Sequence, residues 1–444
     1  MKNLFKKFRF SFRFLFAFWQ KHQKLILLSF LVGILCFLIV PKIYQFFPKK
    51  RTEKIGLIGK FTLNDLPLSV QHLISDGLTT ISEDGQVQPF LASSWQTENE
   101  NKEYLFTLKE NFFWQDGKPV LAKDINYNFS DVATTVIDDK KIKFILKEPF
   151  SPFPAIVSRP VFKKGLVGTG DYKLKKVKKN GQIVEKIILV SVKNKDKTSL
   201  VFHFYPTEMA ARTAFKLGEI DVIKEINDPG DLQGQKNVKI TQEIKYNRVA
   251  AIFFDTQNPK LAAKATRQAL AYAIEKRWQP RALNPINPQS WAFNPTVKKY
   301  EFDLAHAQQL LEGDEEEGEP LKEIELATIP SLFSVAEEIK KDWQKLGIET
   351  KIKSITTLNE SLEALLISQE IPSDPDQYVL WHSTQKSNIT GYKSPKIDKL
   401  LEEARKSQNQ EERKEIYHDF QRFLVEDTPA VFLFHPTLYT VSRI

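Results

Sequence analysis

The pattern of apolar and polar positions changes repeatedly, after residue 54, between the period of a helix and the period of a strand. Residues 104–108 and 141–146 have the strand period, and Asp84-Gly85 and Asp116-Gly117 mark tight turns between such runs. Residues 172–177 also predict a strand, which follows the turn at Gly168-Thr169-Gly170. The interleaving of the two periods predicts an α/β fold with a mixed sheet.

Helix signals concentrate in the second half of the chain. Residues 335–346 carry one apolar stripe that stops at Gly347, and a strand-like run at 348–352 follows. Ser394-Pro395 supplies an N-cap and a first helical residue for a second helix. Further helices are expected over residues 416–424 and over the alanine-rich residues 261–276. The periodicity lapses at Glu312, and residues 312–319 predict a solvated acidic loop.

An almost wholly apolar run occupies residues 25–40 near the N-terminus, with 17 residues between Lys24 and Lys42. Such a helix spans ~25 Å against a hydrocarbon core of ~30 Å, and flanking lysines and aromatic residues cover the difference. A cleaved signal peptide is the alternative, but the small-x-small site that it needs does not follow the run. Residues just before Cys36 also lack the small side chains of a lipid-attachment site. The pattern predicts a basic aromatic cytoplasmic leader at 1–24, an uncleaved transmembrane anchor at 25–47 and a linker at 48–53.

The positive charge of the chain belongs to this leader. The net charge is +9, yet residues 1–51 hold 11 Lys/Arg and no acid, which leaves 53 basic and 55 acidic residues downstream. A slightly acidic body is not a phosphate-tracking surface, so we expect no nucleic-acid partner. Seven of the 11 basic residues precede the apolar run and four follow it, which predicts a cytoplasmic N-terminus and a large domain outside.

Motifs for catalysis or metal binding are not found in the sequence. The seven histidines are scattered without an H-x-x-x-H spacing, and neither a G-x-S-x-G elbow nor a phosphate loop occurs. The motif Gly168-Thr169-Gly170 lacks the third glycine of a dinucleotide site. With a single cysteine, neither a disulfide within the chain nor a multi-cysteine metal site can form. We therefore expect no enzyme, no catalytic residues, no metal and no cofactor.

Several short motifs occur in register over about 370 residues. The first block, within residues 72–129, combines Gly77-Leu78, Asp84-Gly85, a P-F-L-A segment at 89–92, Trp95 and a hairpin that contains Asp116-Gly117. Later blocks are GTG with a tyrosine at 168–172, ARTAFKLGEIDV at 211–222, RQALAYAI at 267–274, KLGI at 345–348 and a final block at 412–429. Together they resemble family 5 extracytoplasmic solute-binding proteins, the dipeptide, oligopeptide and nickel receptors of ABC importers.

The resemblance implies a two-lobed periplasmic-binding-protein-like fold of class II, with an extra subdomain in lobe I. Lobe I would comprise residues 54–250 plus 430–444, and lobe II residues 251–429, with crossovers near 250–254 and 430–434. The implied function is capture of oligopeptides between the lobes and their delivery to ABC permease subunits, by a monomer held at the membrane by its N-terminal helix. A membrane-anchored sensor or scavenger without transport is the alternative. Family members usually continue beyond the point that matches Pro436, so a shortened variant and a truncated reading frame are both open.

The resemblance also suggests where a ligand binds. In peptide-binding members, an acid four positions before a [DE]-P pair holds the peptide's α-amino group. Here Ile371 stands four positions before Pro375, so neighbouring acids are the alternatives. For each tryptophan, core packing is an equal alternative, and for His382 it is the preferred one. The expected ligand-binding residues are Gln369, Glu370, Asp374, Asp376, Tyr378, Trp381 and Trp291.

Overall fold

The computed structural model describes residues 19, 21–25, 27–35, 37–39, 52–192, 198–315, 321–357 and 362–444. The N-terminal part contains one helix, Lys21–Ile39, whose described apolar side chains are exposed. The body from Thr52 onward is a separate compact unit. Residues 1–18 and 20 of the predicted leader, residues 40–51 and Cys36 lie outside the described residues.

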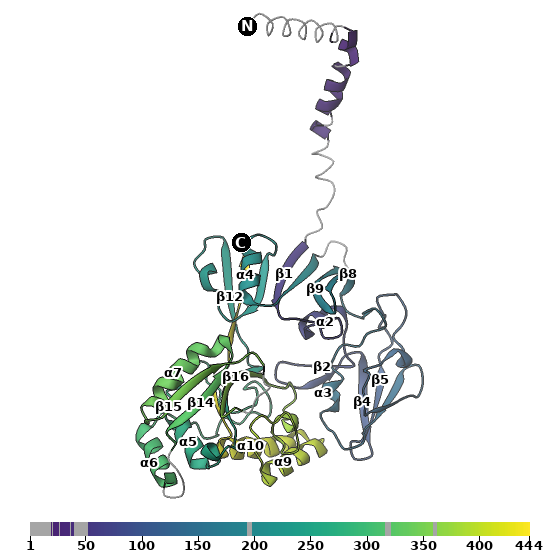
Figure 1. The fold of residues 1–444 in the computed structure, drawn as a ribbon. Helices are drawn as coiled ribbons and strands as arrows, with labels where there is room; N and C mark the ends of the chain where they lie inside the picture. Colours follow the sequence, from purple (N-terminus) through teal and green to yellow (C-terminus); the bar gives the residue numbers. More distant parts are fainter. Residues whose placement is uncertain are drawn as a thin grey trace, which may run out of the picture. The chain divides into compact units, whose positions relative to one another are not determined.

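A seven-stranded mixed sheet contains the first strand of the body and the last strand of the chain (Figure 1). Its order is β12-β18-β11-β1-β10-β9-β8, and β1 runs parallel to both β10 and β11. Helices α2 and α4 pack near this sheet. The bounds are β1 Thr52–Ile58, β8 Tyr172–Asn180, β9 Ile183–Ser191, β10 Ser199–Tyr205, β11 Val222–Ile226, β12 Val238–Ile244, β18 Thr437–Arg443, α2 Leu68–Ile74 and α4 Glu208–Lys216.

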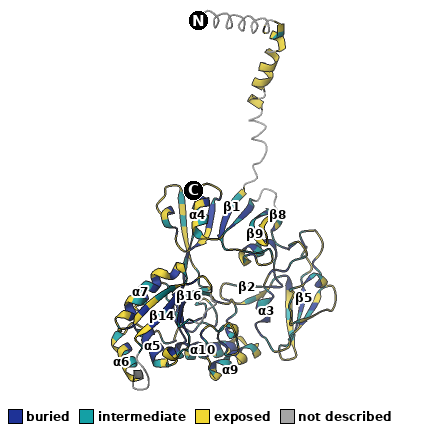
Figure 2. Ribbon diagram, viewed as in Figure 1, coloured by how far each residue is buried: buried dark blue, intermediate teal, exposed yellow. Residues whose placement is uncertain are grey.

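A five-stranded sheet forms from the second half of the chain, in the order β15-β14-β16-β13-β17. Its strands and the helices beside them share the largest hydrophobic core, whose buried residues appear dark blue in Figure 2. The strand bounds are β13 Arg248–Phe254, β14 Glu323–Thr328, β15 Glu349–Ser354, β16 Ala364–Glu370 and β17 Ala430–Phe434. The helix bounds are α5 Lys264–Tyr272, α6 Leu304–Glu315, α7 Phe333–Gln344, α8 Tyr378–Trp381, α9 Pro395–Lys406 and α10 Gln410–Asp427.

A four-stranded antiparallel sheet, in the order β4-β5-β7-β6, has a separate aromatic core. We call it the four-stranded unit, together with α3 and the segments that join these elements. A short hairpin of β2 and β3 precedes it. The bounds are β2 Thr79–Ile81, β3 Val87–Pro89, β4 Ala92–Glu98, β5 Glu103–Leu108, β6 Ala133–Val136, β7 Lys141–Ile145 and α3 Phe153–Ile156.

The chain passes twice between the seven-stranded and the five-stranded sheets, at residues 245–247 and 435–436. The two stretches that were expected to be crossovers lie within strands β13 and β17. These strands pair antiparallel, with Ile252 opposite Val431 and Phe253 opposite Ala430. We call β13 and β17 the strand pair.

The strongest local sequence signals are confirmed. Helix α7 ends before Gly347, whose φ of 79° only glycine adopts readily, and β15 follows. Ser394 caps α9 by accepting a hydrogen bond from the backbone N–H of Ile397. The turn before β8 is also confirmed. A Cβ on Gly168 would lie 2.0 Å from the carbonyl oxygen of Ile74, so this close approach requires glycine.

Two helix predictions need correction. The acidic segment is not a loop from Glu312, because α6 continues through Glu315. Glutamate is a good helix former at exposed positions and needs no apolar period there; residues 316–320 lie outside the described residues. The helix expected over 261–276 is shorter, α5 being Lys264–Tyr272, since Ala263 before it is extended. The buried Arg267 guanidinium donates to the carbonyls of Leu261 and Ala262 and so holds the preceding turn.

Candidate functional site

The loop after β16 carries two of the expected aspartates, and each is paired with an arginine from a helix. Arg413 in the first turn of α10 donates to Asp374 at 2.8 Å. Arg405 near the end of α9 donates to both carboxylate oxygens of Asp376, at 2.7 to 3.1 Å. Bidentate guanidinium pairing of this kind is among the strongest hydrogen-bonded contacts in proteins. Both acids are therefore already engaged within the protein.

The Asp374–Arg413 pair is deeply buried, with both side chains about one-tenth exposed. Burial raises the pKa of the Asp374 carboxyl above its ordinary value, and the positive charge of Arg413 opposes that shift. Breaking such a pair leaves an uncompensated charge in a poorly solvated place. The pair therefore stabilises this loop, and Asp374 does not offer a free carboxylate to a ligand.

Aromatic rings surround Arg413. Its guanidinium carbon lies 5.3 Å from the ring of Trp291 and 5.6 Å from that of Tyr417, and the two rings meet edge to face. The backbone N–H of Trp291 donates to the carbonyl of Asp84 in the β2–β3 turn. A Cβ on Gly85 in that turn would lie 3.2 Å from the carbonyl oxygen of Ser373. The hairpin turn therefore lies directly against the loop that carries Asp374.

The other expected residues are divided between this surface and the core. Tyr378 is half-buried, and the Arg405 guanidinium lies 3.8 Å over its ring. Trp381 is 2% exposed and packs beside Phe253 and Phe432, so it is a core residue in this structure. His382, for which core packing was the preferred interpretation, is also buried.

The two residues at the end of β16 face different surroundings. Gln369 is half-buried and pairs with Val249, whereas Glu370 is exposed opposite Arg248. Within the described residues, no ion pair of the Glu370 carboxylate is found. Of the three acids that were expected near the ligand, Glu370 is therefore the one without an arginine partner in the part of the chain that is described.

The structure brings together Asp374, Asp376, Tyr378 and Trp291, and adds Arg405 and Arg413, which the sequence pattern did not identify. These arginines follow their acids by 29 and 39 residues along the chain. They belong to helix faces that local spacing describes as ordinary charged surface. Their role becomes visible only when α9 and α10 fold back on the loop.

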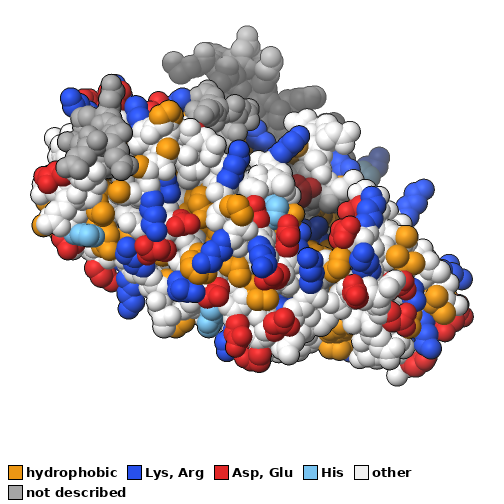
Figure 3. Space-filling model, turned by 90° about the horizontal axis from the view of Figure 1, so that it is seen from below, with side chains coloured by type: hydrophobic (Ala, Val, Ile, Leu, Met, Phe, Trp, Pro, Cys, Tyr) orange, Lys and Arg blue, Asp and Glu red, His pale blue; other side chains and the backbone are white. Residues whose placement is uncertain are grey.

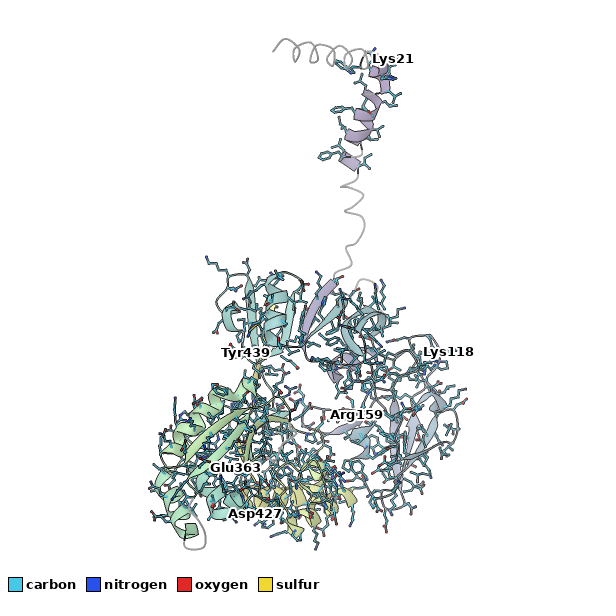
Figure 4. All side chains as sticks on the ribbon, viewed as in Figure 1. Lys21, Lys118, Arg159, Glu363, Asp427 and Tyr439 are labelled. Carbon is cyan, nitrogen blue, oxygen red and sulfur yellow. The ribbon has the colours of Figure 1, made fainter. Side chains whose placement is uncertain are left out.

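Arg159 is a second residue that the sequence pattern did not indicate. It is exposed, it follows α3, and within the described ranges no ion pair of its guanidinium is found. Figure 4 labels it on the side of the four-stranded unit that faces the five-stranded sheet. It is therefore a cation available to an external partner.

Metal binding has no support from the side chains that can be placed. Nowhere in the described ranges do three or more His, Cys, Asp or Glu side chains gather in a group that would hold a metal ion. The two aspartates of the loop are bonded to guanidinium groups, and a guanidinium group cannot act as a metal ligand. The donor set at this surface is suited to hydrogen bonding and charge pairing.

Comparison with known proteins identifies a family and several relatives. The model of "Bacterial extracellular solute-binding proteins, family 5 Middle" matches residues 86–391. The probable D,D-dipeptide-binding periplasmic protein DdpA of Escherichia coli is 24% identical over 409 residues, which cover 78% of this chain and 79% of that protein. The dipeptide-binding protein DppE of Bacillus subtilis is 24% identical, with 81% of this chain and 80% of that protein covered.

Solved structures show the same fold at low identity. NikZ from Campylobacter jejuni, in complex with Ni(L-His), has a TM-score of 0.74 at 24% identity and covers 89% of this chain and 94% of that chain. DppA from Helicobacter pylori, in complex with the peptide STSA, has a TM-score of 0.68 at 21% identity, with 89% and 95% covered. The body thus has the two-lobed α/β fold of periplasmic binding proteins.

Proposed function

Because the chain belongs to family 5 of the bacterial extracellular solute-binding proteins, we propose that it captures oligopeptides between two lobes and delivers them to an ABC permease. The match of the family model to residues 86–391 is the observation that carries this proposal. The names of its relatives, which describe dipeptide and oligopeptide binding, support the class of ligand. The family is defined by solute binding, so the proposed mechanism is recognition and closure rather than catalysis.

We propose that lobe I comprises residues 54–250 plus 430–444, and lobe II residues 251–429. The separate seven-stranded and five-stranded sheets support two lobes, and the chain passes between these sheets at residues 245–247 and 435–436, a few residues from the proposed bounds. The four-stranded unit is the proposed extra subdomain of lobe I. The strand pair β13–β17 lies beside both crossings between the sheets and is the proposed hinge. A ligand that touches both lobes favours the closed form by its greater affinity for that form, and closure is what a permease detects.

The paired aspartates and the exposed Arg159 favour a ligand recognised through its carboxylate. Asp374 and Asp376 are paired with arginines, so neither offers a free charge to a ligand ammonium. Arg159 is exposed and, within the described residues, has no ion-pair partner. We therefore infer that a peptide's terminal carboxylate binds Arg159, and that Glu370 is the remaining candidate for an amine.

This proposal is tested on the full-length protein in nanodiscs, by native mass spectrometry and thermal shift with a mixture of short peptides. Peptides that co-purify or raise the melting temperature support the function, and binding of none contradicts it. For a bound peptide, Arg159→Gln should weaken binding tenfold or more, because a hydrogen-bonded charge pair contributes ~1.5–3 kcal/mol. Amidation of that peptide should remove the difference between Arg159→Gln and wild type.

Lys164→Gln is the matched control, since Lys164 is also exposed and lies five residues further along the chain. It should bind the peptide as wild type does. Equal affinity of Arg159→Gln and wild type would remove Arg159 from the site. Unchanged peptide uptake after deletion of the gene would favour a sensor or scavenger over a transport receptor.

We propose that the N-terminal helix anchors this monomer to the membrane with the large domain outside. Within the part of the chain that is described, Lys21–Ile39 is the one helix long and apolar enough to span a membrane. Its described apolar side chains are exposed, an arrangement that apolar surroundings stabilise. Resistance to carbonate extraction would support the anchor, and release by carbonate would contradict it.

The charge on the face drawn in Figure 3 does not indicate a nucleic-acid partner. Figure 3 shows acidic and basic side chains interspersed over the face that it draws. A nucleic-acid partner would require a continuous basic surface. The net positive charge of the chain lies instead in its first 51 residues.

A further inference from the structure

The C-terminal end of α9 docks on the four-stranded unit. The last carbonyls of any helix lack partners within that helix. Here the backbone N–H of Ser151 donates to the carbonyl of Arg405 at 2.7 Å, and its hydroxyl donates to that of Ala404 at 3.0 Å. The side-chain amide of Asn101 donates to the carbonyl of Lys406 at 2.6 Å. Three of the four terminal carbonyls of α9 are thus capped by residues more than 250 positions away in the chain.

A second group of contacts lies beside these caps. The side-chain amide of Gln408, just after α9, donates to the hydroxyl of Tyr104 at 2.8 Å. That hydroxyl donates in turn to the carbonyl of Phe150 at 2.9 Å. The Arg405 guanidinium lies 5.0 Å from the ring of Phe150. Tyr104 is fully buried in the aromatic core of the four-stranded unit, so this chain of bonds reaches from α9 into that core.

These contacts flank the buried ion pair. The charges of Arg413 and Asp374 both act on the Tyr104 hydroxyl, whose pKa burial raises. The β2–β3 turn also lies close to the pair, against Ser373 and Trp291. Two segments that precede the strand pair in the sequence therefore lie near the ion pair. Separation of these segments from α9 and α10 would expose the pair and the carbonyls of α9 to water.

We propose that Asn101, Tyr104 and Ser151, together with the end of α9 and Gln408, form a latch that holds the lobes closed without ligand. The proposal rests on the proposed function in one respect, that the lobes of this receptor open and close. One such hydrogen bond shifts an equilibrium by about 2-fold to 10-fold, so the loss of three lowers the ratio of closed to open molecules by about tenfold or more. A ligand then enters through openings of the latch.

The test measures the distance between α9 and the four-stranded unit in full-length protein in nanodiscs, with no peptide added. Spin labels are placed at Thr135→Cys in β6 and Lys399→Cys in α9, both exposed, in a Cys36→Ser background. The latch variant combines Asn101→Gly, Ser151→Ala and Gln408→Ala. Glycine is chosen because Asn101 has a φ of 66°, where alanine would add strain.

Pulsed electron spin resonance should give one narrow distance distribution in wild type and a second, longer population in the latch variant. A control variant, Ser93→Ala with Gln96→Ala, changes exposed residues of β4, where the Ser93 hydroxyl bonds within the same sheet. It should keep the wild-type distribution. Tyr104→Phe removes one hydroxyl and keeps the ring in the core. Its population at the longer distance should be smaller than that of the latch variant.

Equal distributions in wild type and the latch variant would overturn the proposal, as would two equally populated distances in wild type. If the triple variant fails to fold, Tyr104→Phe decides alone, and an unchanged distribution in that variant overturns the latch. The measurement contains no peptide. Failure of the latch therefore leaves the proposed function standing, and failure to bind peptides leaves the latch result unaffected.

Discussion

Two connections join the parts of this molecule, the strand pair β13–β17 and the latch at the end of α9. In the strand pair, Ala250 to Phe253 are almost completely buried and bonded through their backbones on both edges. The latch depends on a few side-chain donors, of which Gln408 is exposed and Asn101 half-buried. Backbone ladders in a core contribute stability, whereas solvent-accessible side-chain bonds are easily exchanged for water. We expect the strand pair to govern unfolding and the latch to govern opening.

The largest expected effect tests whether the burial of a contact, rather than its place in the molecule, determines how much free energy of unfolding is lost when the contact is removed. Arg413 lies near the latch but is buried, with 8% of its surface exposed. Arg413→Gln should lower the free energy of unfolding by about 3 to 5 kcal/mol, because Asp374 is left buried without its partner. Denaturant titration measures this change. Arg422→Gln in the same helix, whose pair with Asp419 is exposed, should cost less than about 0.5 kcal/mol.

A somewhat smaller effect is expected in the strand pair. Ile252 is fully buried between β16 and β17, and Ile252→Ala should cost about 2 to 5 kcal/mol through lost burial and a residual cavity. The distance between the spin labels across the latch should remain that of wild type. Val379→Ala, at an exposed apolar position, is the control and should change stability little. A shifted label distance in Ile252→Ala would show that the two connections are not separable.

The smallest expected effect is a pH dependence at the crossing beside the strand pair. His435 is buried, and its Nδ1–H donates to the carbonyl of Arg248 at 2.8 Å. Burial lowers the pKa of His435 below its ordinary value, although the bond to Arg248 opposes the shift. The unfolded chain therefore binds this proton more tightly, so the stabilisation is present above about pH 6.5 and is lost as the pH falls.

Chemical denaturation at pH 7.5 and at pH 5.5 measures this difference. His435→Asn should flatten the pH dependence, since one proton changes stability by at most about 1.4 kcal/mol per pH unit. His72 and His203 also have lowered pKa values from burial. Their contribution to the pH dependence is present in both wild type and His435→Asn. Identical pH profiles for His435→Asn and wild type would contradict the assignment to His435.

The sequence predicted those features whose cause is local. The cap at Ser394, the end of α7 before Gly347 and the turn at Gly168 each follow from one or two residues whose backbone preferences are strong. The continuation of α6 through Glu315 was missed, because a run of glutamates carries no apolar period. Asp374 and Asp376 were expected from the motif as ligand-binding residues, which stays a prediction, whereas their partners Arg413 and Arg405 were not indicated by it. The choice of an ion partner depends on how helices return to a loop, which spacing along the chain does not encode.

The place of β18 has a consequence for the order of assembly. This strand, Thr437–Arg443, lies between β11 and β12 and pairs with both. The sheet that contains the first strand of the body therefore cannot be completed until residue 443 has been synthesised. The pairings of β18 join residues 193 to 220 positions apart in the chain, and such distant pairings form slowly. A chain that crosses a membrane during synthesis consequently does so before this sheet has closed, which keeps the body open until translocation ends.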